Sequence, residues 1–174
     1  MSCSIAHDGN VLRVTLSFLR DELLYDIKNL SFIESDILDD DSGHQKHLIA
    51  DSGENGNVDR LTRIMSISIS QCREFLYPFS KKEVTRTSYD DILREKNYVI
   101  ELEVPDSFSQ TTLHLLEKLI HEYIVCSCMS DWLSMTKPSS SEVWAQKADD
   151  AAMQIRSCAS RRSSRNRIVP HWLS

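Results

Sequence analysis

The chain has 174 residues, of which 41% are hydrophobic and 26% are charged, and its formal net charge is −6. These fractions are typical of a globular protein, and a chain of this length buries about 70% of its unfolded surface. Four Gly and four Pro are too few for a turn-rich all-β sandwich. The first ten residues lack the features of a signal peptide, and no stretch is apolar enough to span a membrane. We expect one domain, residues 1–174.

Charge is distributed unevenly along the sequence. Residues 1–59 contain twelve acidic and four basic residues, which is a net charge of −8. Residues 155–174 contain five arginines and no acid, which is a net charge of +5. Opposite charges at the two ends of a small chain favour head-to-tail self-association in a ring or a filament.

The first long apolar pattern runs through residues 11–34. Apolar residues alternate as far as Phe18, as in a strand, but apolar residues at three- and four-residue spacing continue over five turns. The longer pattern predicts a helix from about residue 16 to residue 33, with Thr15 as its N-cap. The side chains on the helical pattern are Leu12, Leu16, Leu19, Leu23, Ile27 and Leu30.

Residues 35–57 are rich in Asp, Glu, Gly, Ser and Asn and predict a solvated acidic loop, with a short apolar interruption at Leu48 and Ile49. Three successive acids, Asp39 to Asp41, are reminiscent of a calcium loop. They lack the alternating ligand spacing and the closing Glu of an EF-hand, so we expect no calcium site there.

A second helix is predicted from Asn57, a suitable N-cap, to the region of Pro78, which restricts the residue before it. Alternation over residues 98–104, with Glu101 and Glu103 on the face opposite the apolar line, predicts a strand that Pro105 ends. Because a lone strand is unstable, we expect it to pair with residues 84–89 as a β-hairpin flap. The apolar side chains of the second helix are Leu61, Met65, Ile69, Cys72, Leu76 and Phe79.

A third, central helix is predicted over residues 113–135, capped by Asp106 or Ser107, because this stretch is apolar on most of its circumference. The spacing of Ser139 and Glu142 matches a capping box and predicts that the last helix starts there. A basic tail, residues 160–174, follows it. The predicted fold is mainly α, a bundle of about four helices with a small β-hairpin flap. The apolar line of the last helix is Trp144, Ala148, Ala151, Ala152, Ile155 and Cys158.

No pattern of residues predicts catalysis. Cys126 lies five residues after His121, an offset of roughly 140° around a helix, so the two side chains should diverge. The sequence has no nucleophile elbow, phosphate loop, dinucleotide fingerprint or zinc-protease motif. The cysteines are odd in number, and four lie in apolar helical segments where a free thiol acts as a small hydrophobe. We expect no enzyme, no cofactor and no bound metal.

The arginines of the last segment are the candidate interaction residues, together with one tryptophan. Three interpretations stay open: a solvated tail, contact with an acidic protein surface such as that of a neighbouring copy, and contact with nucleic acid. A basic run suits phosphates, although the chain as a whole is acidic. The candidate residues are Arg156, Arg161, Arg162, Arg165, Arg167 and Trp172.

Several stretches resemble small proteins of the head–tail connector, or head-completion, type from tailed phages and prophages. The stretches are ENGNVDRLTRIMSISISQCREFLYPF, IELEVPDSF, LIHEYIVCSCMSDWL and the last helix with its Arg-rich tail, within residues 54–170. The resemblance implies a mainly helical, non-enzymatic virion-assembly protein that forms rings at a portal vertex. Its implied partners are copies of itself, other virion proteins and DNA, which the tail would contact, with no membrane. The implied location is the virion or the bacterial cytoplasm.

Overall fold

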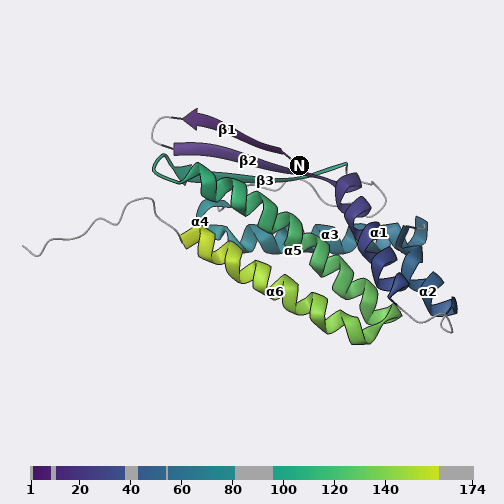
Figure 1. Cartoon of the computed structure of the whole chain (residues 1–174). Helices are drawn as coiled ribbons and strands as arrows, with labels where there is room; N and C mark the ends of the chain where they lie inside the picture. The colour runs from purple at the N-terminus through teal and green to yellow at the C-terminus, as the bar shows by residue number, and fades with distance from the viewer. Residues whose placement is uncertain (1, 9–10, 38–42, 54, 81–95, 161–174) are drawn as a thin grey trace, which may run out of the picture.

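The computed structural model describes residues 2–8, 11–37, 43–53, 55–80 and 96–160. Within these residues it contains six α-helices, one short 3-10 helix and a three-stranded antiparallel sheet (Figure 1). The mainly α prediction is confirmed, but the helices number six because two short ones accompany the four long ones. In chain order the elements are β1 (Ser2–Asp8), β2 (Val11–Leu19), α1 (Arg20–Asp36), α2 (Gly43–Ala50), the 3-10 helix (Asp51–Gly53), α3 (Asn55–Phe75), α4 (Tyr77–Ser80), β3 (Asn97–Pro105), α5 (Gln110–Thr136) and α6 (Pro138–Ser160).

The sheet has the order β1-β2-β3, with β2 in the centre. Alternate residues of β2 are buried, and each stands opposite a buried residue of β3. Side chains on this face therefore meet in pairs across the two strands, and such pairs stabilise a sheet. The buried pairs are Leu12 with Val104, Val14 with Leu102, Leu16 with Ile100, and Phe18 with Tyr98.

The predicted start of the first helix is wrong. Residues 16–19 belong to β2, the helix begins at Arg20, and its N-cap is Leu19. Thr15 lies inside the strand and caps no helix. The alternation that ends at Phe18 was the correct signal, because backbone partners on both β1 and β3 stabilise the extended conformation of these residues.

The strand predicted at residues 98–104 is confirmed as β3, and its Tyr98, Ile100, Leu102 and Val104 are all buried. Its observed partner is β2, whose paired residues lie 78 to 94 positions earlier in the chain. The predicted partner, residues 84–89, lies outside the described residues. The sheet therefore joins the first and the middle thirds of the chain.

Helix α5 is central, as predicted. The sheet lies along one side of it and α6 runs antiparallel along another side, while α1 and α3 complete the bundle (Figure 1). Two reciprocal hydrogen bonds between Ser130 and Ser141 join the start of α6 to α5. Small side chains at these positions let the two backbones approach closely. The predicted apolar line of α6 is buried throughout.

Three local predictions need correction. The expected loop 35–57 contains helix α2, and Ile49 of that helix is fully buried, with its carbonyl oxygen accepting a hydrogen bond from Trp132. Helix α5 is capped at Ser109 and not at Asp106 or Ser107. Helix α6 begins at Pro138, so the Ser139 capping box does not form; proline suits the first helical position because it needs no hydrogen-bond acceptor there.

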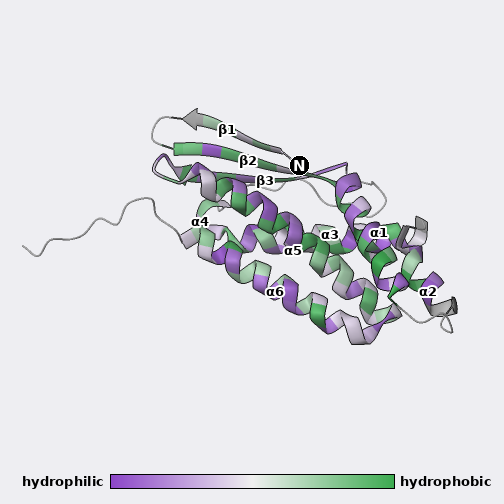
Figure 2. Cartoon of the chain, in the orientation of Figure 1, coloured by the Kyte–Doolittle hydropathy of each residue, from purple (hydrophilic) through white to green (hydrophobic). Residues whose placement is uncertain are grey.

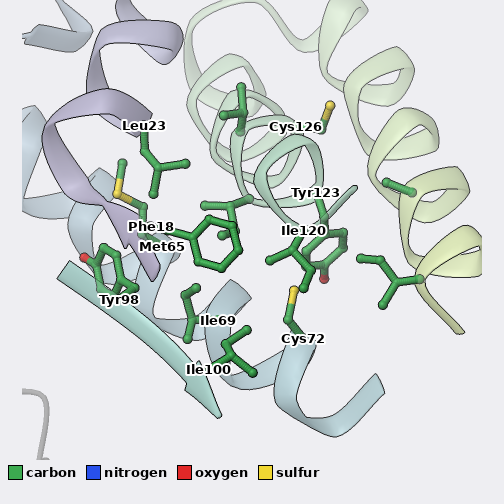
Figure 3. Packing of buried hydrophobic residues seen from close by; sticks show 14 of the residues in the cluster. Phe18, Leu23, Met65, Ile69, Cys72, Tyr98, Ile100, Ile120, Tyr123 and Cys126 are labelled. Carbon is green, nitrogen blue, oxygen red and sulfur yellow. The ribbon is translucent and has the colours of Figure 1, made fainter. Parts of the chain in front are cut away.

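Buried apolar residues from the sheet and all the long helices form one cluster. Figure 3 shows Phe18, Ile69, Ile100 and Ile120, from β2, α3, β3 and α5, pointing into the same space. Each is fully buried. This single core fixes the position of α1, which follows β2 without an intervening residue.

Candidate protein interface

Helix α1 is held at both ends. At its start, the backbone N–H of Arg20 donates a hydrogen bond to the carbonyl oxygen of Lys96, 3.0 Å away. Near its end, Glu34 accepts hydrogen bonds from Lys137 Nζ and Trp144 Nε1, each at 2.9 Å. Helix α1 therefore has a fixed orientation, with one side against the core and one side outward.

The Glu34 contacts form a small polar network at the corner where α5 turns into α6. Only 16% of the Glu34 side chain and 12% of the Lys137 side chain are exposed. Burial raises the pKa of the Glu34 carboxyl, but hydrogen bonds from Lys137, Trp144 and Ser140 and the charge of Lys137 outweigh burial and hold that pKa below its ordinary value. The carboxylate form of Glu34 is thus part of the folded structure.

The outward side of α1 and its C-cap carries four large apolar side chains, which we call the outer apolar face. Tyr25 and Phe32 are each 64% exposed, Ile33 is 52% exposed and Ile37 is 69% exposed. Residues seven apart lie on nearly the same line of a helix, so Phe32 follows Tyr25 along one side. In Figure 2 the first turn of α1 is purple and green bands follow in later turns. Apolar surface that gathers on one face marks interaction sites.

An acidic groove of about 580 Å³ lies at the first half of α1, where this helix meets the middle of α5. Asp21 and Glu22 are exposed, while Asp26 is half-buried and contacts His121 of α5. Tyr25 belongs to both the groove and the outer apolar face. The groove is lined by Asp21, Glu22, Tyr25, Asp26 and His121.

His121 and Asp26 form a close ionisable pair in the groove. The Nε2 atom of His121 lies 2.7 Å from Oδ2 of Asp26. The other ring nitrogen, Nδ1, is buried and has no hydrogen-bond partner within the described residues. A carboxylate that orients a histidine activates a nucleophile only if that second nitrogen faces one. The pair instead fastens α1 to α5.

The cysteines have the surroundings of packing residues. Cys126 donates a weak hydrogen bond to Glu122, 3.5 Å away, and burial together with that carboxylate raises its pKa to about 12. Burial also raises the pKa of Cys72 and Cys128 well above the usual range. Because the thiolate is the reactive form, these thiols are poor nucleophiles at neutral pH. His121 contacts Asp26 and not Cys126.

Of the predicted interaction residues, the structure describes Arg156 alone. Its guanidinium lies 4.1 Å from the ring centre of Phe75, a cation–π contact that ties α6 to α3. The remaining predicted residues, Arg161, Arg162, Arg165, Arg167 and Trp172, lie outside the described residues. Arg156 thus has an intramolecular contact.

Sequence reasoning missed the outer apolar face. The signal was present, because Tyr25, Phe32 and Ile33 lie off the helical line that predicts the buried side of α1. The side of α1 opposite this line should face solvent, and large apolar residues are unexpected on a face that is exposed to solvent.

Two further properties concern only the described part of the chain. No group of three or more His, Cys, Asp or Glu residues there is arranged to hold a metal ion. No helix in that part is both long and apolar enough to cross a membrane.

Comparisons with protein-family models, with curated proteins and with solved structures gave no match for this chain. The resemblance to connector proteins therefore stays a prediction from the sequence. Inferences about function depend on the surface described above.

Proposed function

We propose that this chain is a phage or prophage virion-assembly subunit of the head–tail connector type that acts by protein–protein contact. The observation that supports this most directly is the outer apolar face: four large apolar side chains, each more than half exposed, on a helix that is anchored at both ends. A rigid, apolar helix face suits association with another protein surface, because binding it requires no reordering of the backbone.

The distribution of charge supports assembly from many copies. Helix α1 carries five acids and two bases, whereas the basic tail has no acid. Helix α6, which leads to the tail, ends at the opposite end of the bundle from the α1–α2 corner (Figure 1). Contacts between unlike surfaces of identical subunits are heterologous, and they close into rings when the rotation between subunits permits.

Light scattering coupled to size-exclusion chromatography tests the proposal. The full chain should form oligomers at about 50 mM NaCl and dissociate partly at about 500 mM, where the Debye length falls from roughly 14 Å to roughly 4 Å. The Phe32→Ser variant, which removes exposed apolar area without touching the core, should form fewer oligomers. A strictly monomeric chain at high concentration and low salt, with no binding to portal-type proteins, would count against connector function.

The alternative function is that of an adaptor or regulator that contacts nucleic acid through its basic tail. Four arginines without an acid between residues 160 and 174 favour it. In that case binding to duplex DNA should fall steeply as salt rises and should disappear when these arginines are replaced by Gln. DNA binding that persists in such a variant would exclude the tail as the contact.

A further inference from the structure

The outward side of α1 is acidic in its first turns and apolar in its last turns. Its first two turns form one wall of the acidic groove, where Asp21 and Glu22 are exposed. Its last turns carry Phe32, Ile33 and Ile37, each more than half exposed. From Asp21 the helix rises about 17 Å to Phe32 and about 24 Å to Ile37 at 1.5 Å per residue. A partner that fits this surface has a basic part and an apolar part a short distance apart.

The basic tail has both parts in its sequence. Residues 161–167 contain four arginines, and residues 168–173 contain Ile168, Val169, Trp172 and Leu173. Seven residues separate Arg165 from Trp172, and seven residues extend at most about 25 Å. This reach exceeds the distance along α1, so one such segment is long enough to cover the acidic groove and the apolar end together.

We propose that the outward side of α1, from the acidic groove to Ile37, is the docking site for the basic tail of a second copy of this chain. This inference rests on the proposed assembly function and identifies the two surfaces that would meet. Arginines would lie against the exposed carboxylates of Asp21 and Glu22 and donate charge-assisted hydrogen bonds to them. One oxygen of Asp21 also lies 3.4 Å from Nη2 of Arg20. Trp172 and its apolar neighbours would cover Phe32, Ile33 and Ile37.

A second copy fits better than the tail of the same chain. Helix α6 starts at Pro138, next to the Glu34 corner, and its 23 residues carry Ser160 roughly 34 Å away from that corner. Trp172 lies twelve residues beyond Ser160, which is at most about 43 Å of chain. The tail would have to be nearly fully extended to reach Ile37 of its own chain around the bundle. The tail of another copy has no such restriction.

Charge reversal of each surface in separate full-length variants provides the test. One variant carries Asp21→Lys and Glu22→Lys, and the other carries Glu in place of all four tail arginines, Arg161→Glu, Arg162→Glu, Arg165→Glu and Arg167→Glu. Alone, each variant places like charges on both surfaces and should associate at least roughly tenfold more weakly than the original chain at low salt. Mixed together, the two variants again offer opposite charges, so association should return. Sedimentation velocity measures the species in each sample.

Two controls separate docking from loss of folding. Asp149→Lys with Asp150→Lys reverses an equally exposed acidic pair on α6 and should leave association unchanged. Phe32→Ser should weaken association roughly tenfold, while Met153→Ser, which replaces a side chain that is 58% exposed on α6, should not. Far-UV circular dichroism of each variant should match that of the original chain.

The outcomes distinguish this inference from the proposed function. Oligomers that form equally well in both charge-reversal variants would overturn the docking site and leave assembly through other surfaces intact. Weakened variants whose mixture stays dissociated would overturn docking between copies and would indicate a tail that binds its own chain. A monomeric original chain that gains no partner under any of these conditions would overturn both.

Discussion

The network around Glu34 makes a quantitative prediction about stability. In the Glu34→Ala variant, Lys137 keeps a charge that is only 12% exposed, and the indole N–H of Trp144 loses its acceptor. Removing one partner of a buried ion pair typically costs 3–5 kcal/mol, and an unpaired buried N–H adds about 1–3. Because a part of each side chain still contacts water, we expect a loss of about 2–3 kcal/mol in the free energy of unfolding.

A double-mutant cycle isolates the pair. Glu34→Ala, Lys137→Ala and the double variant should show a coupling energy of about 1–2 kcal/mol between the two positions. The matched control is the pair of Arg60 and Asp131, which has a comparable 2.8 Å contact but side chains that are 44% and 27% exposed. This pair makes two hydrogen bonds, of 2.8 and 3.2 Å, but it is more exposed, so its coupling energy should stay below about 1 kcal/mol.

Urea unfolding followed by circular dichroism measures all of these variants. For a chain of this length, a loss of 2 kcal/mol also lowers Tm by about 4–8 °C. Equal coupling energies for the buried and the exposed pair would refute the reasoning that burial determines the strength of this contact. A Glu34→Ala variant as stable as the original chain would show that the network does not fasten α1.

Three further predictions concern the same structure. Because the pKa of Glu34 is lowered on folding, the Glu34 carboxylate contributes fully to the free energy of unfolding above its unfolded pKa of about 4.5. This contribution is lost as pH falls through the lower pKa of the folded state. The Glu34→Gln variant should therefore lose less stability on acidification than the original chain, which urea midpoints measured across an acid pH series would show. Thiol titration of the native chain at pH 8 should label Cys3 at most, because Cys72, Cys126, Cys128 and Cys158 are buried, and a second fast thiol would contradict this packing. Leu16→Ala should cost about 2–4 kcal/mol and Leu19→Ala less than about 1, since Leu16 is fully buried in β2 whereas Leu19 is 41% exposed; equal losses would instead support a helix through both residues.

Long helices were predictable from the sequence because their signal is local and repeated. The apolar residues of α3 and α6 recur at helical spacing over several turns, so the sequence of each helix indicates which side is buried. Helix α5 was predictable for a different reason: it is apolar on nearly every side, and such a helix has to be central. The alternation of residues 98–104 was equally clear, because buried side chains take every second position and Glu101 and Glu103 lie between them on the other face.

The candidate interface was only partly predictable. The charges at the two ends of the chain are a property of the sequence, and they led to the prediction that Arg-rich and acidic parts interact. The outer apolar face depends on which side of α1 the core covers. That side is determined by contacts of Ser31 with Met129 and of Glu34 with Lys137, residues about 100 positions apart.

By itself, therefore, the sequence determined the mainly α class, the long helices, the strand at residues 98–104 and the separation of charge. Tertiary structure decided that residues 11–19 form a strand, because both of the periodic patterns in that segment are possible locally and only pairing with β1 and β3 favours one. Tertiary structure also decided that Tyr25, Phe32, Ile33 and Ile37 stay exposed. A helix has an outer face only once the rest of the chain has packed against its inner face.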